Sequence, residues 1–351
     1  MTSGSELLEV GGGTERRRPA VPRPVILMLS GALVAAVVTA GLVELAPWLQ
    51  GPPDTGLRVL VRGEGGLAWV DVDSGQRQEL HVGGSADVAV VTIVGTGVVL
   101  QSPQRAPVAD AVVGYAAAGS VHQVGEADRV LPASASSVWL VVDGSRGVEG
   151  GVALASAYGE WRSRIFPVPP RMQVVGTADD LLLALTGRYR SRQLVLWDAH
   201  AAERTASLGW VLGVRQVAAG HALVTTGCLT SGCTSATVSL SDGTTTEVSP
   251  PRGWSEAGEP GLVGDEGQVA MVVTDESGRS SLAVGVPDDL RLVDVALPPS
   301  TQRILDAGDG WLVLPAADED VVLWRAGLSV DRQPRVELAA GERVLGVTPA
   351  T

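Results

Sequence analysis

The chain has 351 residues, 45% of them hydrophobic and 19% charged, a balance that excludes an intrinsically disordered protein. Its formal net charge of −13 at pH 7 would repel a phosphate backbone, so we expect no nucleic-acid binding. The acidity favours a basic or cationic partner, unless it serves solubility alone. Lysine and asparagine are absent, which excludes a P-loop and a Schiff-base lysine.

The N-terminal region predicts a membrane anchor. Residues 1–24 are rich in glycine and proline, which is typical of a disordered tail. From Val25 to Leu45 the only charge is Glu44, and a helix over these residues would be about 32 Å long, enough to cross a bilayer. Arginines at 16–18 and 23 precede this segment, so the positive-inside rule predicts a cytoplasmic N-terminus.

The alternative for this segment is a cleaved signal peptide, whose apolar region has about 7–15 residues followed by a small-residue cleavage site. The segment is longer and no such site follows it, so we expect an uncleaved transmembrane helix over residues 25–46. Residues 47–55 predict a stiff linker because they contain two consecutive prolines. Residues 56–351 would then form the extracytoplasmic domain of a single-pass cell-membrane protein.

The rest of the chain predicts strands in a repeat. Short runs rich in valine, leucine and tryptophan alternate with turns rich in glycine, aspartate and serine. Each repeat unit holds a strand-like run, a second and third run that follow it, and in most units a fourth that precedes it. Four strands in about 42 residues are typical of the blades of a β-propeller. The first runs are aligned at Leu57, Val98, Trp139, Leu182, Ala222, Val269 and Trp311.

The last strand-like run, from Glu342 to Thr348, has no unit after it, and the first unit lacks the run that should precede it. We therefore predict that residues 342–348 pair beside residues 57–61 and close the ring. The predicted fold class is all-β: a seven-bladed β-propeller with four-stranded antiparallel blades, preceded by a single transmembrane helix. Six or eight blades are alternatives because the unit near Trp254 is irregular, whereas a β-sandwich would lack the long period.

Two segments resemble known repeat families. Residues 67–80, LAWVDVDSGQRQEL, resemble the strand–turn–strand unit of YVTN-type propellers. The run LVLWDAH carries Trp197 and Asp198 at the strand end where WD repeats place this pair. Over about residues 56–350 the chain is thus similar to membrane-anchored bacterial members of the YVTN/WD-repeat β-propeller superfamily.

The two cysteines, Cys228 and Cys233, flank a predicted turn in the fifth unit. Outside the cytoplasm a pair with this spacing predicts a structural disulfide bond. A redox-active or metal-binding pair is the alternative, but a metal site would need more ligands than the nearby His221.

No reaction motif is present, so we predict no catalytic, cofactor-binding or metal-binding residue. A nucleophile elbow is lacking, and the four histidines lie in different units without ligand spacing: His81, His122, His200 and His221. The run from Asp71 to Gly75 begins like a calcium loop but lacks the third acidic residue, and a hairpin turn explains it better.

The tryptophans divide into two predicted groups. One group falls within predicted strands and should pack between blades: Trp69, Trp139, Trp197, Trp311 and Trp324. The other group falls near turns, where its members either join the core or form the aromatic surface of a ligand site: Trp161, Trp210 and Trp254.

These observations favour a binding or scaffold module, an anchored propeller that engages an envelope protein or polymer through loops at its channel mouth. The alternative is a propeller enzyme with a site at the channel mouth, of a quinoprotein-like, lactonase-like or glycan-cleaving kind. Such families use asparagine, lysine, or clusters of arginine and tyrosine, whereas asparagine and lysine are absent here and the chain has three tyrosines. A sensor that signals through the cytoplasmic tail is a third reading.

Overall fold

The computed structural model describes residues 54–350, except for 81–89, 103–111, 118–119, 144–149, 189–190, 230–231, 265, 294, 296, 298–300, 316–319, 327 and 329–331. The predicted tail, the predicted transmembrane helix and most of the predicted linker lie outside the described residues. In the part of the chain that the structure describes, no helix is long and apolar enough to cross a membrane.

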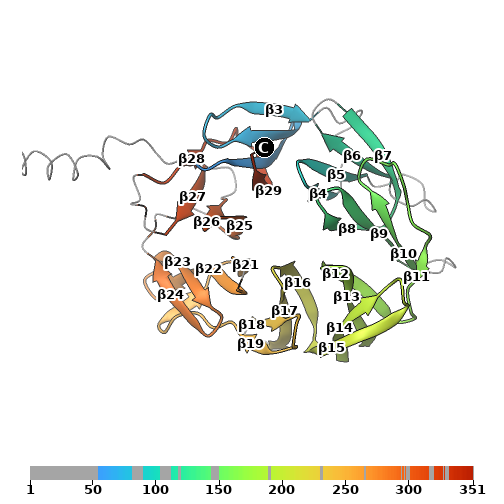
Figure 1. Ribbon diagram of the computed structural model, residues 1–351. Coiled ribbons are helices and arrows are strands. Elements are labelled where there is room, and N and C mark those ends of the chain that lie inside the picture. The colour runs from blue at the N-terminus through green and yellow to red at the C-terminus, as the bar shows by residue number, and fades with distance from the viewer. Residues whose placement is uncertain are drawn as a thin grey trace, which may run out of the picture. The chain divides into compact units, whose positions relative to one another are not determined.

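The described strands form seven antiparallel sheets, which we number in chain order (Figure 1). Sheet 1 has the order β29 (Arg343–Pro349), β1 (Leu57–Gly63), β2 (Gly66–Asp71) and β3 (Arg77–Leu80). Sheet 2 contains β4 (Val90–Val94), β5 (Gly97–Ser102), β6 (Val112–Ala117) and β7 (Ser120–Glu126). Sheet 3 contains β8 (Arg129–Ser134), β9 (Ser137–Val142), β10 (Gly151–Ser156) and β11 (Phe166–Pro167).

The other four sheets follow the same strand order. Sheet 4 contains β12 (Met172–Ala178), β13 (Leu181–Arg188), β14 (Ser191–Asp198) and β15 (Glu203–Val211). Sheet 5 contains β16 (Gly213–Ala218), β17 (His221–Leu229), β18 (Gly232–Ser239) and β19 (Thr245–Glu247). Sheet 6 contains β20 (Trp254–Glu256), β22 (Gln268–Asp275), β23 (Ser280–Val286) and β24 (Asp289–Val293), with β21 (Gly261–Val263) also paired to β22. Sheet 7 contains β25 (Leu305–Gly308), β26 (Trp311–Leu314), β27 (Val321–Arg325) and β28 (Arg335–Val336).

The apolar core is divided into clusters that each join two consecutive sheets. Successive residues of a middle strand face opposite sides, so Leu223 packs toward sheet 6 while Val224 packs toward sheet 4. Pairs that represent the clusters in ring order are Trp69 with Leu100, Val99 with Leu140, Trp139 with Trp197, Leu183 with Val224, Leu223 with Met271, Val272 with Leu314, and Val313 with Val61. Because the last cluster joins sheet 7 to sheet 1, the packing returns to its starting point.

The five tryptophans predicted to pack between blades are buried in these clusters, which confirms that prediction: Trp69, Trp139, Trp197, Trp311 and Trp324. The innermost strands also contact one another in a circle, in the order β29, β4, β8, β12, β16, β21, β25 and again β29. The chain is therefore an all-β propeller with mainly four-stranded antiparallel blades.

The predicted closing strand is confirmed. β29 pairs with β1, with Val347 opposite Val59 and Gly346 opposite Leu60. The last strand of the chain thus completes the sheet that the first strand begins, and this pairing covers an edge of β1 that would otherwise be open.

The inner part of sheet 6 is irregular, as the sequence indicates near Trp254. β20 and β21 both pair with β22, and the residues between these two strands belong to neither pairing. The N–H groups of Ala257 and Gly258 both donate to the carbonyl oxygen of Val272, at 2.9 Å and 3.3 Å. The backbone of Glu259 instead donates to the carbonyl of Gln302, which precedes sheet 7, at 2.8 Å.

Candidate ligand site between the inner strands

A cavity of about 420 Å³ lies among the innermost strands. Its lining comes from five of the seven sheets, which places it on the axis of the ring: Ile93, Arg215, Gln216, Ala218, Glu259, Pro260, Gly261, Arg303, Ile304, Leu305, Asp306, Gly346 and Val347. Most of these residues are apolar or glycine. The charged residues among them therefore determine what the cavity can bind.

Arg215 reaches this cavity because of a β-bulge. The pairing of β16 with β17 shifts register between Val214 and Gln216, which leaves Arg215 without a residue opposite it. A bulge turns the side chain of the extra residue away from the regular alternation of the strand. The Arg215 side chain is exposed, and its Nε donates to the hydroxyl of Thr225 at 3.2 Å.

Two glutamates lie beside Arg215. Glu256 is the last residue of β20, and Glu259 lies between β20 and β21. Both carboxylates therefore lie at the interruption between these two strands of sheet 6. With Arg215, Cys233 and Gln302 they line a second cavity of about 630 Å³, which shares Arg215 and Glu259 with the first. Neither carboxylate accepts a hydrogen bond from any residue that the structure describes, so both are available to a ligand.

The electrostatics of Glu256 follow from this position. Its partial withdrawal from water raises its pKa, the positive charge of Arg215 acts in the opposite direction, and the negative charge of Glu259 raises it further. The negative charge of Glu259 therefore opposes the ionisation of Glu256, and a cationic group placed beside Glu256 would relieve that repulsion.

The opposite wall of the axial cavity is held by two charged residues that already have partners. Arg303 donates to the carbonyl of Val344 in β29, and Asp306 accepts from the N–H of Gly264 at 3.1 Å. Both bonds join neighbouring sheets, so these side chains stabilise the ring. Arg215 bonds only within its own sheet, to Thr225, and Glu256 and Glu259 have no hydrogen-bond partner among the described residues, so these three charged residues are the ones available to a ligand.

The structure does not bring the three predicted ligand-surface tryptophans together. Trp161 follows β10 at the outer side of sheet 3 and is 49% exposed, while Trp210 lies in β15, the outer strand of sheet 4, and is 66% exposed. Trp254 lies in β20 on the inner side of sheet 6. They occupy three separate sheets and do not form one aromatic surface.

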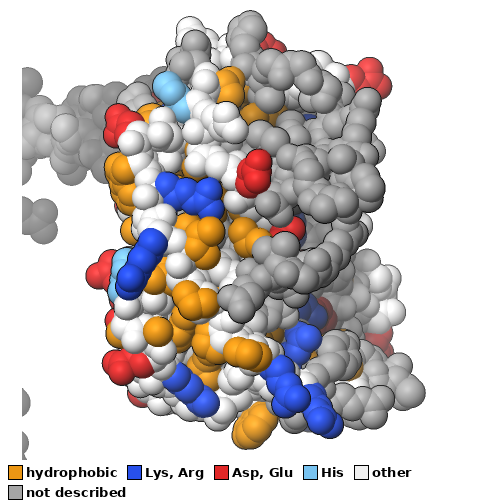
Figure 2. Space-filling model, turned by 90° about the vertical axis from the view of Figure 1, so that its right-hand side faces the viewer, with side chains coloured by type: hydrophobic (Ala, Val, Ile, Leu, Met, Phe, Trp, Pro, Cys, Tyr) orange, Lys and Arg blue, Asp and Glu red, His pale blue; other side chains and the backbone are white. Residues whose placement is uncertain are grey.

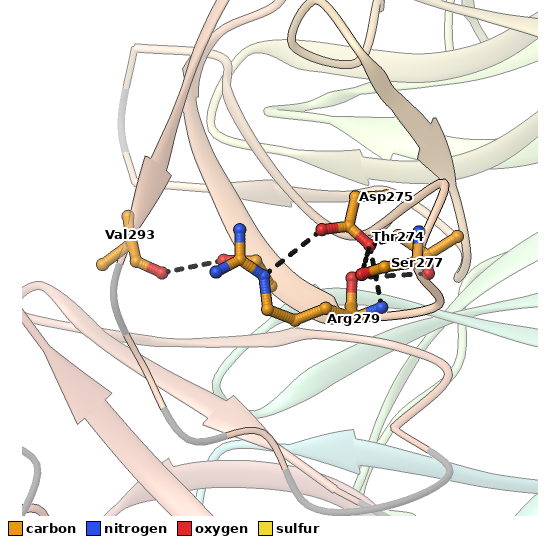
Figure 3. Close-up of polar contacts among 6 residues, drawn as sticks. Thr274, Asp275, Ser277, Arg279 and Val293 are labelled. Atoms are coloured by element: carbon orange, nitrogen blue, oxygen red, sulfur yellow. Dashed lines mark hydrogen bonds and ion pairs between the residues drawn. The ribbon is translucent and has the colours of Figure 1, made fainter.

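A hydrogen-bonded turn between β22 and β23 lies beside Trp254, and Figure 3 shows the polar contacts of its residues Asp275, Ser277 and Arg279. The guanidinium of Arg279 lies 5.3 Å from the Trp254 ring centre, and its Nε is 3.3 Å from Asp275 Oδ2. Asp275 Oδ1 accepts from the N–H and hydroxyl of Ser277 and from the N–H of Arg279. These bonds lower the pKa of Asp275, with the Ser277 hydroxyl as the largest cause.

The cysteines form the predicted disulfide bond. Cys228 and Cys233 are directly opposite each other in β17 and β18. Cys233 also lines the cavity that contains Glu256. The disulfide bond therefore cross-links β17 and β18 beside the site.

The run from Asp71 to Gly75 forms the hairpin turn that the sequence predicts. Asp71 Oδ1 accepts from the N–H of Ser74 at 2.8 Å and from its hydroxyl at 2.7 Å, and Gly75 has a φ of 67°. Among the residues that the structure describes, no group of three or more His, Cys, Asp or Glu side chains is arranged to hold a metal ion.

Sequence reasoning missed Arg215, Glu256 and Glu259 as a group. They lie in two different repeat units. The bulge in β16 and the interruption between β20 and β21 bring them to the same cavities. The irregular spacing near Trp254 was the one sequence signal that pointed to this region.

No protein family matches the sequence, and no curated protein matches it either. Solved structures match the fold. An acylaminoacyl peptidase from Pyrococcus horikoshii has a TM-score of 0.53 at 12% identity, and the match covers 78% of this chain and 48% of the peptidase. This chain therefore corresponds to about half the length of that enzyme.

The propeller domain of the Trilobed protease from Pyrococcus furiosus has a TM-score of 0.53 at 11% identity, with 82% of this chain and 97% of that domain covered. That domain is described as having an open velcro topology, whereas β29 pairs with β1 in the present chain. At these identities the similarity establishes the β-propeller fold alone.

Proposed function

We propose that this chain is a seven-bladed propeller that is anchored outside the cell by a transmembrane helix over residues 25–46 and binds an envelope protein or polymer. The ligand site is the pair of adjoining cavities at the inner strands, where a cationic group of the partner lies between Glu256 and Glu259. The observation that carries the proposal is that these two carboxylates lie beside Arg215 in the cavities without a hydrogen-bonding partner among the described residues.

Two further observations support the proposal. The seven sheets and the clusters between them form a closed circle, which is the arrangement of a complete propeller. The sequence from Val25 to Leu45 is long and apolar enough for a membrane helix, with arginines before it.

The binding site is tested with the full-length protein carrying Glu256→Gln and Glu259→Gln together. Chemical cross-linking to an envelope fraction should yield a specific adduct with the parent protein, and the double variant should lose it. The matched control carries Glu203→Gln and Glu247→Gln, which remove the same charge from outer strands. If both variants retain the adduct equally, the cavities are not the binding site.

The anchor is tested separately. In isolated membranes, the protein should resist carbonate extraction. In intact cells, an external protease should digest residues 56–351 and spare an N-terminal tag. Release by carbonate, or digestion of the tag, would contradict the proposed topology.

A second candidate function is cleavage of a glycan at the same cavities. It is favoured by the raised pKa of Glu256 next to a second carboxylate, because such enzymes need one protonated and one ionised carboxyl group. Release of reducing sugars from envelope glycan by the parent protein, and its loss in Glu256→Gln, would support this function. Absence of any release would leave the binding function.

A further inference from the structure

At the outer edge of sheet 3, the residues just before β11 also run beside β10. We call residues 161–167, which include β11, the edge segment. Arg162 lies opposite Ala155 of β10, and Phe166 lies opposite Val152. The spacing between these pairs differs by one residue on the two strands, so the segment contains a bulge between Arg162 and Phe166.

One residue of this segment, Arg162, has its backbone groups directed away from β10. Ser156 donates its N–H to the carbonyl of Trp161 at 2.9 Å, and Ser163 donates its N–H to the carbonyl of Leu154 at 2.8 Å. In an antiparallel ladder this pattern directs the N–H and C=O of Arg162, the residue between them, away from β10. An added strand could pair with these groups.

The side chains of the edge segment combine positive charge with exposed apolar surface. Ile165 is 57% exposed and Trp161 is 49% exposed, although both are large hydrophobic residues. Arg162 and Arg164 are also exposed, and Arg164 stacks 5.3 Å from the centre of the buried Phe166 ring. Figure 2 views the side on which β7, β10 and β11 lie in Figure 1, and arginine side chains stand among hydrophobic ones there.

An apolar groove of about 600 Å³ adjoins the edge segment at Pro167. Its lining includes Val141, Val168, Pro169, Pro170 and Met172, together with Arg171. The one acidic residue in its lining, Asp143, is held by Arg129 at 2.7 Å and is therefore neutralised.

The charge of this region differs from that of the rest of the protein. Residues 129–211, which contain sheets 3 and 4, carry nine arginines and seven acidic residues, whereas the other residues from 54 to 351 carry 13 arginines and 28 acidic residues. Arg162, Arg164 and Arg171 form no ion pair with any described residue, in contrast to Arg77 and Arg129. Their charge is available to a negatively charged partner.

We propose that the edge segment and the adjoining groove form a docking surface for an extended acidic polypeptide of a partner protein. The partner adds a strand beside Arg162, places its carboxylates against Arg162 and Arg164, and inserts an apolar side chain into the groove beyond Pro167. This surface is separate from the cavities at the inner strands, so either proposal can fail without the other.

The test uses the full-length protein in detergent at physiological ionic strength, with fluorescence anisotropy of a short labelled peptide in which glutamate alternates with valine. The peptide should bind, and Arg162→Glu with Arg164→Glu should weaken binding by at least about tenfold because two attractions become repulsions. The matched control carries Arg291→Glu and Arg335→Glu, which make the same charge change on the outer strands β24 and β28, and should bind as the parent does.

Two altered peptides separate strand addition from simple charge attraction. Lysine in place of glutamate should abolish binding, and N-methylation of alternate peptide nitrogens should weaken it because it removes the backbone donors. The proposal is overturned if the peptide does not bind, if the N-methylated peptide binds equally, or if the control variant loses as much affinity as the edge variant. A dimer of the protein in light scattering that dissociates in the edge variant would also overturn it, because the surface would then receive a second copy.

Discussion

Arg77 and Glu342 form an ion pair between residues that are 265 positions apart in the chain. Arg77 lies in β3, the outer strand of sheet 1, and Glu342 directly precedes β29, the inner strand of the same sheet. Both guanidinium Nη atoms contact the carboxylate, one of them at 3.2 Å, and the N–H of Ala339 donates to it at 2.8 Å. The pair therefore holds the closing strand at the point where the chain enters it.

Removal of the Glu342 carboxylate should weaken the closure of the ring. Glu342 is buried, so Glu342→Ala leaves Arg77 and the N–H of Ala339 without their acceptor, and we expect a loss of about 2 kcal/mol in the free energy of unfolding. Urea denaturation of the full-length protein measures it. Arg291→Ala, which breaks the exposed pair with Asp289, is the control and should change stability by less than about 0.5 kcal/mol.

The same carboxylate should make the protein sensitive to acid. Burial acts to raise the pKa of Glu342, but the hydrogen bonds from Arg77 and Ala339 and the charge of Arg77 together lower it below its usual value. The stability from this lowered pKa is present above the unfolded-state value and is lost as pH falls through the folded-state value. In urea midpoints measured from neutral to about pH 3, Glu342→Gln should flatten the acid limb.

Glu256 should show the opposite sign. Its pKa is raised in the folded protein, so its ionisation reduces stability as pH rises above the unfolded-state value. Glu256→Gln should therefore raise the urea midpoint at neutral pH relative to the parent, and the difference should shrink in acid. A lower midpoint at neutral pH would show that the carboxylate has a stabilising partner.

Gly95 should not tolerate a side chain. It has a φ of 56°, and a Cβ there would lie 2.4 Å from the carbonyl oxygen of Ala135 in the turn of the next sheet. Gly95→Ala should therefore reduce the free energy of unfolding by at least about 2 kcal/mol through strain and displacement. Gly278 has a φ of 83° but no atom within 4 Å of its Cβ position, so Gly278→Ala should lose only about 1 kcal/mol. Equal losses in the two variants would show that the contact with Ala135 is not tight.

Trp197 and Trp210, both in sheet 4, should respond differently to truncation. Trp197 is buried between sheets 3 and 4, so Trp197→Ala creates a cavity and should reduce stability by about 3–5 kcal/mol. Trp210 is 66% exposed, so Trp210→Ala should leave the unfolding transition nearly unchanged. Thermal unfolding followed by circular dichroism distinguishes them, and a large loss in Trp210→Ala would reveal packing that its exposure does not indicate.

The sequence by itself determined the repeat, the strand chemistry and the closure. Apolar runs that alternate with turn residues predict strands, and their long period predicts the repeat. The terminal strand, which has no unit of its own, is predicted to pair with β1. The buried tryptophans and the turn at Asp71 follow from local chemistry, since both depend on residues close in the chain.

Only the tertiary structure decided where the charged residues meet. A single bulged residue in β16 turns Arg215 toward the axis, and the break between β20 and β21 brings Glu256 and Glu259 beside it. Likewise, Arg162 faces solvent because sheet 3 ends there. A shift of one residue reverses the side to which a strand residue points, and such a shift leaves too small a trace in a period of about 42 residues to be read from the sequence.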